Sequence, residues 1–145
     1  GMVVQEFLEY HDVTTDHIAI RTKRYEGIDK ANNKTEVYGL EYLVERVSPE
    51  KNLLFVDDVY DTGLTMKAVL EELERKARRN TPKDIRIATV YYKPSRNQTS
   101  RVPDFYVYTT EKWLVFPHEF QGLTPEEIRQ GKGAEIAKLF KEKPK

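Results

Sequence analysis

The segment LLFVDDVYDTGLT, residues 53–65, constrains this chain more than any other part of its sequence. Four apolar residues run into two adjacent acids, Asp57 and Asp58, and a third acid, Asp61, precedes a small polar turn. Apolar residues then recur at helical spacing over residues 66–77. The pattern predicts a buried strand that ends in a polar loop and leads directly into a helix.

Such a turn is suited to binding an anion. Backbone N–H groups and the positive end of the helix dipole converge at the start of a helix, so we expect a phosphate on residues 61–65. Gly63 allows close approach of the backbone, and the threonine hydroxyls of the turn add donors. Asp57 and Asp58 lie just upstream, where carboxylates accept from a vicinal diol or help to hold a divalent cation. Together these features indicate a ribose 5-phosphate ligand.

The segment resembles the phosphoribosyl-pyrophosphate (PRPP) signature of the type I phosphoribosyltransferases, an apolar run followed by D-D-x-x-D-T-G-x-T. An ordinary strand, acidic turn and helix is the alternative interpretation. Neither of the other common phosphate-binding patterns, G-x-x-x-x-G-K-[ST] and G-x-G-x-x-G, occurs in the chain. The resemblance implies an α/β fold with a mostly parallel sheet, flanking helices and a small base-binding hood. We expect one domain over 1–145, with a core at about 1–95 and a base-binding part at about 96–145.

Composition excludes several other classes of protein. The 24 basic residues balance the 24 acidic ones, so no net field favours nucleic acid as a partner. The apolar runs are too short for a membrane-spanning helix. The sequence has no cysteine, which excludes disulfides and thiolate metal sites and fits a cytoplasmic protein. We therefore expect a small-molecule enzyme or binding protein.

Further elements follow from periodicity and turn residues. We expect helices at 3–10, at 63–79 and from Thr124 onward, a mobile loop at 22–34, and strands at 17–21, 35–43, 52–57, 85–92, 105–108 and 113–116. Alternating strands and helices favour a parallel sheet, whose ligands bind at the carboxyl ends of the strands.

A second resemblance concerns the purine base. The segments Tyr91-Tyr92-Lys93-Pro94 and Trp113-Leu114-Val115-Phe116-Pro117 resemble short bacterial 6-oxopurine phosphoribosyltransferases, which use xanthine and guanine or hypoxanthine. The resemblance implies that Lys93 donates to the purine 6-oxo group, that Trp113 stacks on the ring and that Leu114 reads its edge. An ammonium group only donates, so it favours a 6-oxopurine over adenine. A surface lysine and a core tryptophan are the simpler interpretations, and the choice among 6-oxopurines stays open.

The resemblance also implies a reaction, in which a purine takes the 5-phosphoribosyl group from PRPP and Mg²⁺ neutralises the departing pyrophosphate. Asp57 and Asp58 are expected to bind the ribose hydroxyls and the metal, and Asp61 to handle the purine N7 proton. The 5-phosphate is expected to contact Asp61, Thr62, Gly63, Leu64 and Thr65. The loop 22–34 corresponds to the family's hood, which closes to exclude water.

One departure from the family pattern bears on activity. Family members begin with a first core strand and a Gly-rich pyrophosphate loop, whereas this sequence opens in what resembles the following helix. We expect an N-terminally truncated fold whose exposed sheet edge favours a homodimer or higher homo-oligomer. The alternative to a purine salvage enzyme is a catalytically impaired module of the same fold that binds PRPP or a nucleotide.

Overall fold

The computed structural model describes residues 1–25, 34–120 and 122–140. The chain divides into two compact units, residues 1–111 and 112–145. The expected single domain over 1–145 stays a prediction.

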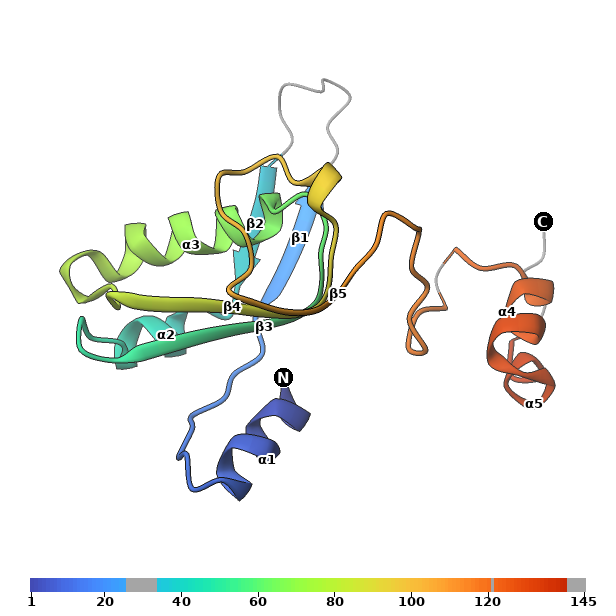
Figure 1. The fold of residues 1–145 in the computed structure, drawn as a ribbon, viewed down its shortest axis with the longest axis horizontal. Coiled ribbons are helices and arrows are strands. Elements are labelled where there is room, and N and C mark those ends of the chain that lie inside the picture. Colours follow the sequence, from blue (N-terminus) through green and yellow to red (C-terminus); the bar gives the residue numbers. More distant parts are fainter. Residues whose placement is uncertain (26–33, 121, 141–145) are drawn as a thin grey trace. The chain divides into compact units, whose positions relative to one another are not determined.

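A three-stranded parallel sheet forms the centre of the first unit (Figure 1). Its strands are β3 (Asn52–Tyr60), β4 (Asp84–Tyr92) and β5 (Phe105–Thr109), in the order β3-β4-β5. The register of the first pair places Phe55 opposite Ile87. The predicted strands 85–92 and 105–108 and their parallel arrangement are confirmed.

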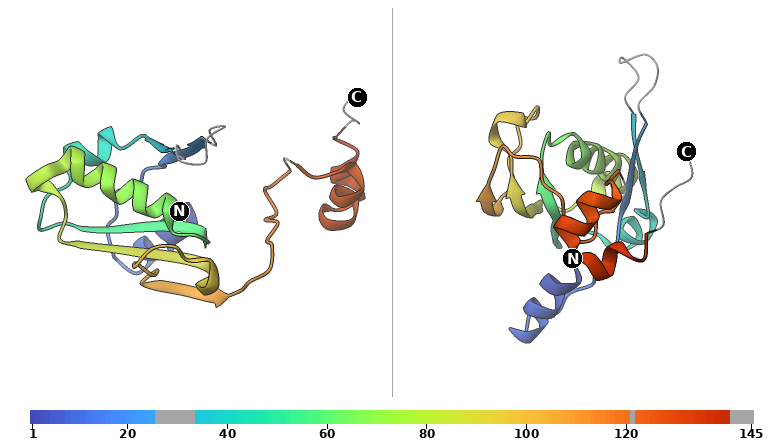
Figure 2. Two further views of the ribbon diagram at one scale, coloured as in Figure 1. Left: turned by 90° about the horizontal axis from the view of Figure 1, so that it is seen from above. Right: turned by 90° about the vertical axis from the view of Figure 1, so that its right-hand side faces the viewer.

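Helix α3 (Leu64–Ala77) lies along β3 and β4, as Figure 2 shows. Apolar residues three or four positions apart share one face of a helix, so α3 has a continuous apolar side. That side buries Met66, Val69, Leu73 and Ala77. It forms one core cluster with Phe55 and Ile87 of the sheet. Burying such side chains contributes about 1.5–3 kcal/mol each, so this packing fixes where α3 begins relative to the end of β3.

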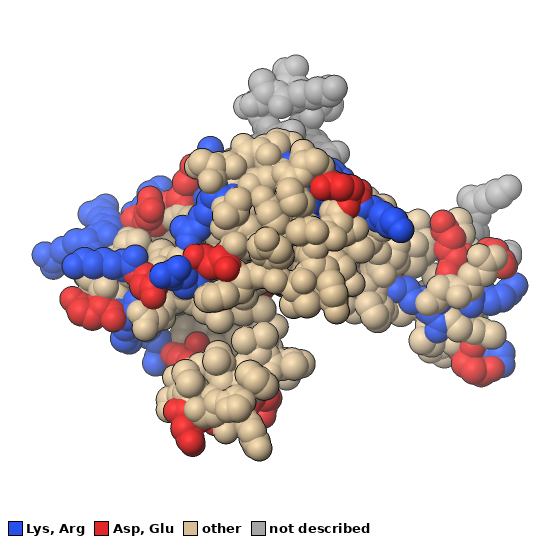
Figure 3. All heavy atoms as spheres, in the orientation of Figure 1, with Lys and Arg blue, Asp and Glu red and all other residues tan. Residues whose placement is uncertain are grey.

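The end of α3 is basic. The last turn of α3 and the following 3₁₀ turn (Arg78–Asn80) carry four basic residues, Arg75, Lys76, Arg78 and Arg79. Figure 3 shows Lys and Arg side chains gathered at that end of the first unit. Positive charge there complements the negative end of the helix dipole.

The remaining elements of the first unit are smaller. Strands β1 (Arg21–Tyr25) and β2 (Lys34–Tyr38) form an antiparallel pair, and β2 lies against α3. Helix α2 (Glu41–Arg46) follows β2. Helix α1 (Met2–Tyr10) matches the helix expected at 3–10 but buries none of its residues.

Three predictions for this region differ from the structure. The strand expected at 17–21 begins only at residue 21, and β1 occupies the first part of the loop expected at 22–34, because pairing with β2 satisfies its backbone groups. Residues 26–33 lie outside the described part of the chain. The strand expected at 35–43 stops at Tyr38, because Gly39 turns the chain with φ of +86°, and α2 follows.

The second unit contains α4 (Pro125–Lys132) and α5 (Ala134–Ala137). The predicted helix start at Thr124 is confirmed by a capping box, in which the Glu127 N–H donates to Thr124 Oγ1 at 3.3 Å. The strand expected at 113–116 is wrong, since these residues pair with no strand in the described part of the chain and Trp113 is 79% exposed. Among the described residues, no helix is long and apolar enough to cross a membrane.

Candidate functional site

The acidic pair lies inside a strand. β3 continues to Tyr60, beyond the end predicted at residue 57, so Asp57 and Asp58 both have extended backbone. Successive side chains of a strand project to opposite sides, so the two carboxylates leave β3 in different directions. Asp57 is exposed and Asp58 is half-buried. The pair therefore offers two separate carboxylates near the carboxyl end of β3, an edge strand of the described three-stranded sheet.

The environment of Asp57 disfavours its charge. Although the residue is exposed overall, surrounding protein atoms withdraw its carboxyl from water, and this desolvation raises the pKa of Asp57. Repulsion from Asp58 raises the pKa further, whereas a hydrogen bond from the Asp58 N–H to Asp57 Oδ1, at 3.0 Å, opposes the shift. A cation or hydroxyl donor would relieve this cost, so Asp57 is suited to meet a ligand.

The turn after β3 has the geometry expected for an anion site. Gly63 has φ of +76° and ψ of −11° and directly precedes α3. Its carbonyl accepts from the Lys67 N–H at 2.9 Å, which closes the first turn of the helix. Within the described structure α3 has no side-chain cap, and the Leu64 N–H makes only a long contact of 3.4 Å with Thr62 Oγ1. The first N–H groups of a helix have no intrahelical partner, so this helix start is of the kind that can donate to an anion.

Asp61 lies between two cations. Lys93 Nζ is 3.4 Å from Asp61 Oδ2, and Arg96 Nε forms an ion pair with Asp61 Oδ1 at 2.9 Å. The second contact lacks hydrogen-bond alignment, so Oδ1 is held by charge alone. The Lys93 side chain is only 3% exposed, against 27% for Asp61. The structure therefore brings the expected N7 acid and the expected 6-oxo lysine together.

Sequence reasoning missed Arg96. The residue lies on a 3₁₀ turn, Pro94–Arg96, that follows β4. Its position three residues after Lys93 was the available signal, because i and i+3 side chains share one side of such a turn.

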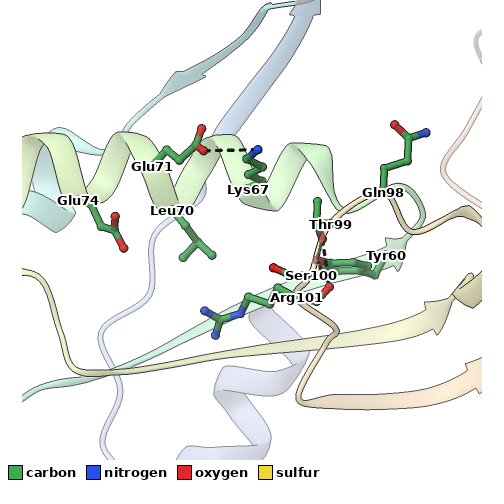
Figure 4. Close-up of a pocket in the computed structure, with 9 residues that line it drawn as sticks. All are labelled: Tyr60, Lys67, Leu70, Glu71, Glu74, Gln98, Thr99, Ser100 and Arg101. Atoms are coloured by element: carbon green, nitrogen blue, oxygen red, sulfur yellow. Dashed lines mark hydrogen bonds and ion pairs between the residues drawn. The ribbon is translucent and has the colours of Figure 1, made fainter.

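Sequence reasoning also missed the segment 97–101. The Gln98 N–H donates to Thr62 O at 2.9 Å, and the hydroxyls of Tyr60 and Thr99 lie 3.3 Å apart. A groove of about 280 Å³ separates this segment from α3, and Figure 4 shows Tyr60 and Thr99 at one end of it. The only signal in the sequence was a polar run after β4, Asn-Gln-Thr-Ser at residues 97–100.

The other proposed base contacts lie in the second unit. Trp113 and Leu114 belong to residues 112–145, whereas Lys93 belongs to the first unit. Their roles in binding a purine stay predictions.

The donor set bears on the expected metal ion. Within the described residues, no group of three His, Cys, Asp or Glu side chains is placed to hold a metal. Mg²⁺ commonly binds one or two carboxylates together with phosphates of the substrate. Asp57 and Asp58 provide carboxylates beside the phosphate turn, so the residues fit an ion held chiefly by a phosphorylated ligand.

Comparisons with known proteins identify the family of this chain. The phosphoribosyl transferase domain family matches residues 3–123. The crystal structure of purine phosphoribosyltransferase from Pyrococcus horikoshii Ot3 superposes with a TM-score of 0.54 and 35% identity, over 72% of this chain and 62% of that one. A hypothetical protein from Neisseria gonorrhoeae with bound ppGpp gives a TM-score of 0.53 at 21% identity, over 78% and 64% of the two chains. Phosphoribosyltransferase domain-containing protein 1 of Xenopus laevis is 33% identical over 86 residues, 59% of this chain.

These relatives are longer than this chain, which spans 62% of the Pyrococcus protein and 35% of the Xenopus protein. The expected fold class is confirmed as a phosphoribosyltransferase fold, with a parallel three-stranded sheet flanked by helices. With a family match over residues 3–123 and the signature turn at the start of α3, the chain belongs to the phosphoribosyl transferase domain family.

Proposed function

We propose that this chain transfers a 5-phosphoribosyl group from PRPP to a 6-oxopurine, forming a nucleoside 5'-monophosphate and pyrophosphate. The observation that carries the proposal is the turn between β3 and α3, where Gly63 starts an uncapped helix directly after the acids of β3. The 35% identity to a purine phosphoribosyltransferase supports a purine as the acceptor.

In the proposed reaction, the bond from ribose C1 to the pyrophosphate oxygen breaks and a bond from C1 to a purine nitrogen forms. The leaving pyrophosphate keeps the electron pair, and the purine loses a proton. Asp61 accepts that proton, and its contacts with Lys93 and Arg96 hold the carboxylate in place. Neutralising the pyrophosphate charge is the chemistry that bound Mg²⁺ supplies.

The sugar and phosphate are held by the signature residues. Asp57 and Asp58 accept from the ribose hydroxyls, and their negative charge stabilises the electron-poor C1 as the leaving group departs. The backbone of Thr62–Thr65 donates to the 5-phosphate at the start of α3.

Base selection falls to Lys93 in this proposal. An ammonium group has three donors, so a contact with Asp61 is compatible with a second one to a purine 6-oxo group. Because only 3% of the Lys93 side chain is exposed, we expect a local rearrangement when the base enters. Trp113 stacking on the ring and Leu114 reading its edge complete the proposed contacts.

The test is turnover of PRPP with Mg²⁺ and each of hypoxanthine, guanine, xanthine and adenine, beside Asp61→Asn. We expect transfer to at least one 6-oxopurine in preference to adenine. Loss of the proton acceptor is expected to lower kcat about 100-fold or more. The substitution is close to isosteric, so binding of ribose 5-phosphate should persist.

Two results would contradict the proposal. A preference for adenine over the 6-oxopurines would contradict the proposed recognition of a purine 6-oxo group by Lys93. Binding of PRPP without turnover of any base would instead identify a binding module of the same fold.

A further inference from the structure

We infer that Tyr60, Asn97 and Thr99 are positioning residues for the 5-phosphate, because their polar side-chain atoms pack against Gly63 and hold the signature turn in place. None of the three belongs to the signature-turn residues 61–65. The inference rests on the proposed function, since it assumes that a phosphoribosyl phosphate binds at this turn.

The first step is the packing behind Gly63. A Cβ placed on Gly63 would lie 2.7 Å from Thr99 Oγ1, 2.8 Å from the Tyr60 hydroxyl and 2.9 Å from Asn97 Oδ1. Polar atoms from one strand end and one distant loop therefore converge on the single residue that directly precedes α3. They leave no room for the glycine to move toward them.

The second step is a backbone connection. The Gln98 N–H donates to Thr62 O at 2.9 Å, so the loop is tied to the turn one residue before Gly63. Residues 97–99 thus contact the turn through both main chain and side chains.

The third step is the rigidity of the loop itself. The Arg101 carbonyl lies within hydrogen-bonding distance of Asn97 Nδ2 at 2.9 Å, Tyr60 OH at 3.1 Å and Thr99 Oγ1 at 3.1 Å. Asn97 Oδ1 in turn accepts from the Thr99 N–H at 3.0 Å. Tyr60 is 4% exposed, so the network is anchored on a buried side chain of β3 (Figure 4).

Rigidity matters because phosphate binding depends on aligned N–H groups. A turn already fixed in its bound conformation loses less conformational entropy when the ligand arrives. Weakening the network is therefore expected to weaken phosphate binding without touching the ligand. This effect should leave recognition of the base unchanged.

The experiment compares Thr99→Val with Thr99→Ser. Valine keeps the shape of threonine but removes the hydroxyl, whereas serine keeps the hydroxyl. The probe is ribose 5-phosphate, titrated calorimetrically at a temperature where all three proteins are folded. We expect its Kd to rise about three- to tenfold in Thr99→Val, which corresponds to one lost hydrogen bond. Thr99→Ser should stay within about twofold of the unaltered chain, since the hydrogen bond is kept.

Tyr60→Phe provides an independent second variant that lacks the hydroxyl at the other end of the contact. An unchanged Kd for ribose 5-phosphate in both Thr99→Val and Tyr60→Phe would overturn the inference. That result would not contradict the proposed transferase function. Weaker binding in both, with no turnover by the unaltered chain, would support the inference and contradict the proposed function. Failure of the unaltered chain to bind ribose 5-phosphate would overturn the inference.

Discussion

At the scale of single residues, Asp57 carries a charge that the folded chain disfavours. Desolvation and the neighbouring Asp58 raise the pKa of its carboxyl above the ordinary value. A raised pKa in the folded state means that ionisation costs stability at every pH above it. The cost is lifted as the pH falls through the folded-state pKa and is absent below the unfolded-state value of about 3.9.

Asp57→Asn should therefore stabilise the chain at neutral pH. The amide keeps an oxygen that accepts from the Asp58 N–H but removes the unfavourable charge. Because Asp57 is exposed, we expect a gain of about 0.5 kcal/mol at most at pH 7, shrinking toward zero at about pH 3, below the unfolded-state pKa. Urea unfolding of both proteins at the two pH values measures it. A variant no more stable than the parent at pH 7 would contradict the sign of the pKa shift.

The pair Asp61 and Lys93 gives a second prediction at this scale. Asp61→Asn and Lys93→Met should each destabilise the chain, because each weakens the ion pair of a lysine that is only 3% exposed. The double variant should lose less than the sum, with a coupling free energy of about 0.5–3 kcal/mol. Urea unfolding of the four proteins at pH 7 gives this coupling. Strictly additive losses would mean that the 3.4 Å contact contributes nothing.

The residues of the candidate site could be predicted from the sequence where they belong to one local motif. The signature turn was found because its residues are consecutive, and the structure places them between β3 and α3 as expected. Arg96 and Thr99 were missed because they reach the turn across more than thirty residues of sequence, and only the fold of β4 brings them there. The only local signals for them are the position of Arg96 three residues after Lys93 and the polar run at 97–100, and neither specifies a contact with the turn.

At the scale of elements, the junction of β3 and α3 depends on one glycine. Gly63→Ala should be costly, because φ of +76° is unfavourable for alanine and its Cβ would lie 2.7 Å from Thr99 Oγ1. We expect a loss of about 1–3 kcal/mol in unfolding free energy and weaker binding of ribose 5-phosphate.

Gly131→Ala in α4 is the matched control. Apart from its chain neighbours and the backbone of its own helix, no atom of the described residues lies within 4 Å of a Cβ placed there. The residue is inside a helix, so alanine should stabilise by about 0.5–1 kcal/mol. Urea unfolding of both variants makes the comparison. Equal effects at the two glycines would exclude a special role for the Gly63 backbone.

Elements with strong periodicity could be predicted, and those fixed by pairing or burial could not. α3 and β4 have long apolar patterns, and their predicted ranges agree with the structure within two residues at each end. The segment 113–116 has strand-forming residues but no pairing strand in its unit, so propensity alone gave the wrong element. α2 replaced a predicted strand because Gly39 ends β2 and because Leu43, Val44 and Val47 pack on the core, with Val47 four and three residues after the other two.

At the scale of the whole molecule, the proposed base contact by Trp113 requires the second unit to take part in binding the purine. Trp113 is the single tryptophan of the chain and lies in the second unit, 79% exposed. An exposed indole emits as in water, and stacking on a purine ring changes that emission. The fluorescence of the unaltered chain therefore reports directly on the proposed role of Trp113.

Inosine 5'-monophosphate should quench or shift the Trp113 emission, whereas ribose 5-phosphate should not. The two ligands share the sugar phosphate, so both occupy the turn before α3 and differ only in the base. Titration of each, with free N-acetyltryptophanamide titrated in parallel to correct for light absorption by the purine, isolates the effect of stacking. An identical response to the two ligands would contradict a base contact by Trp113 and would leave purine recognition to Lys93 and its neighbours in the first unit.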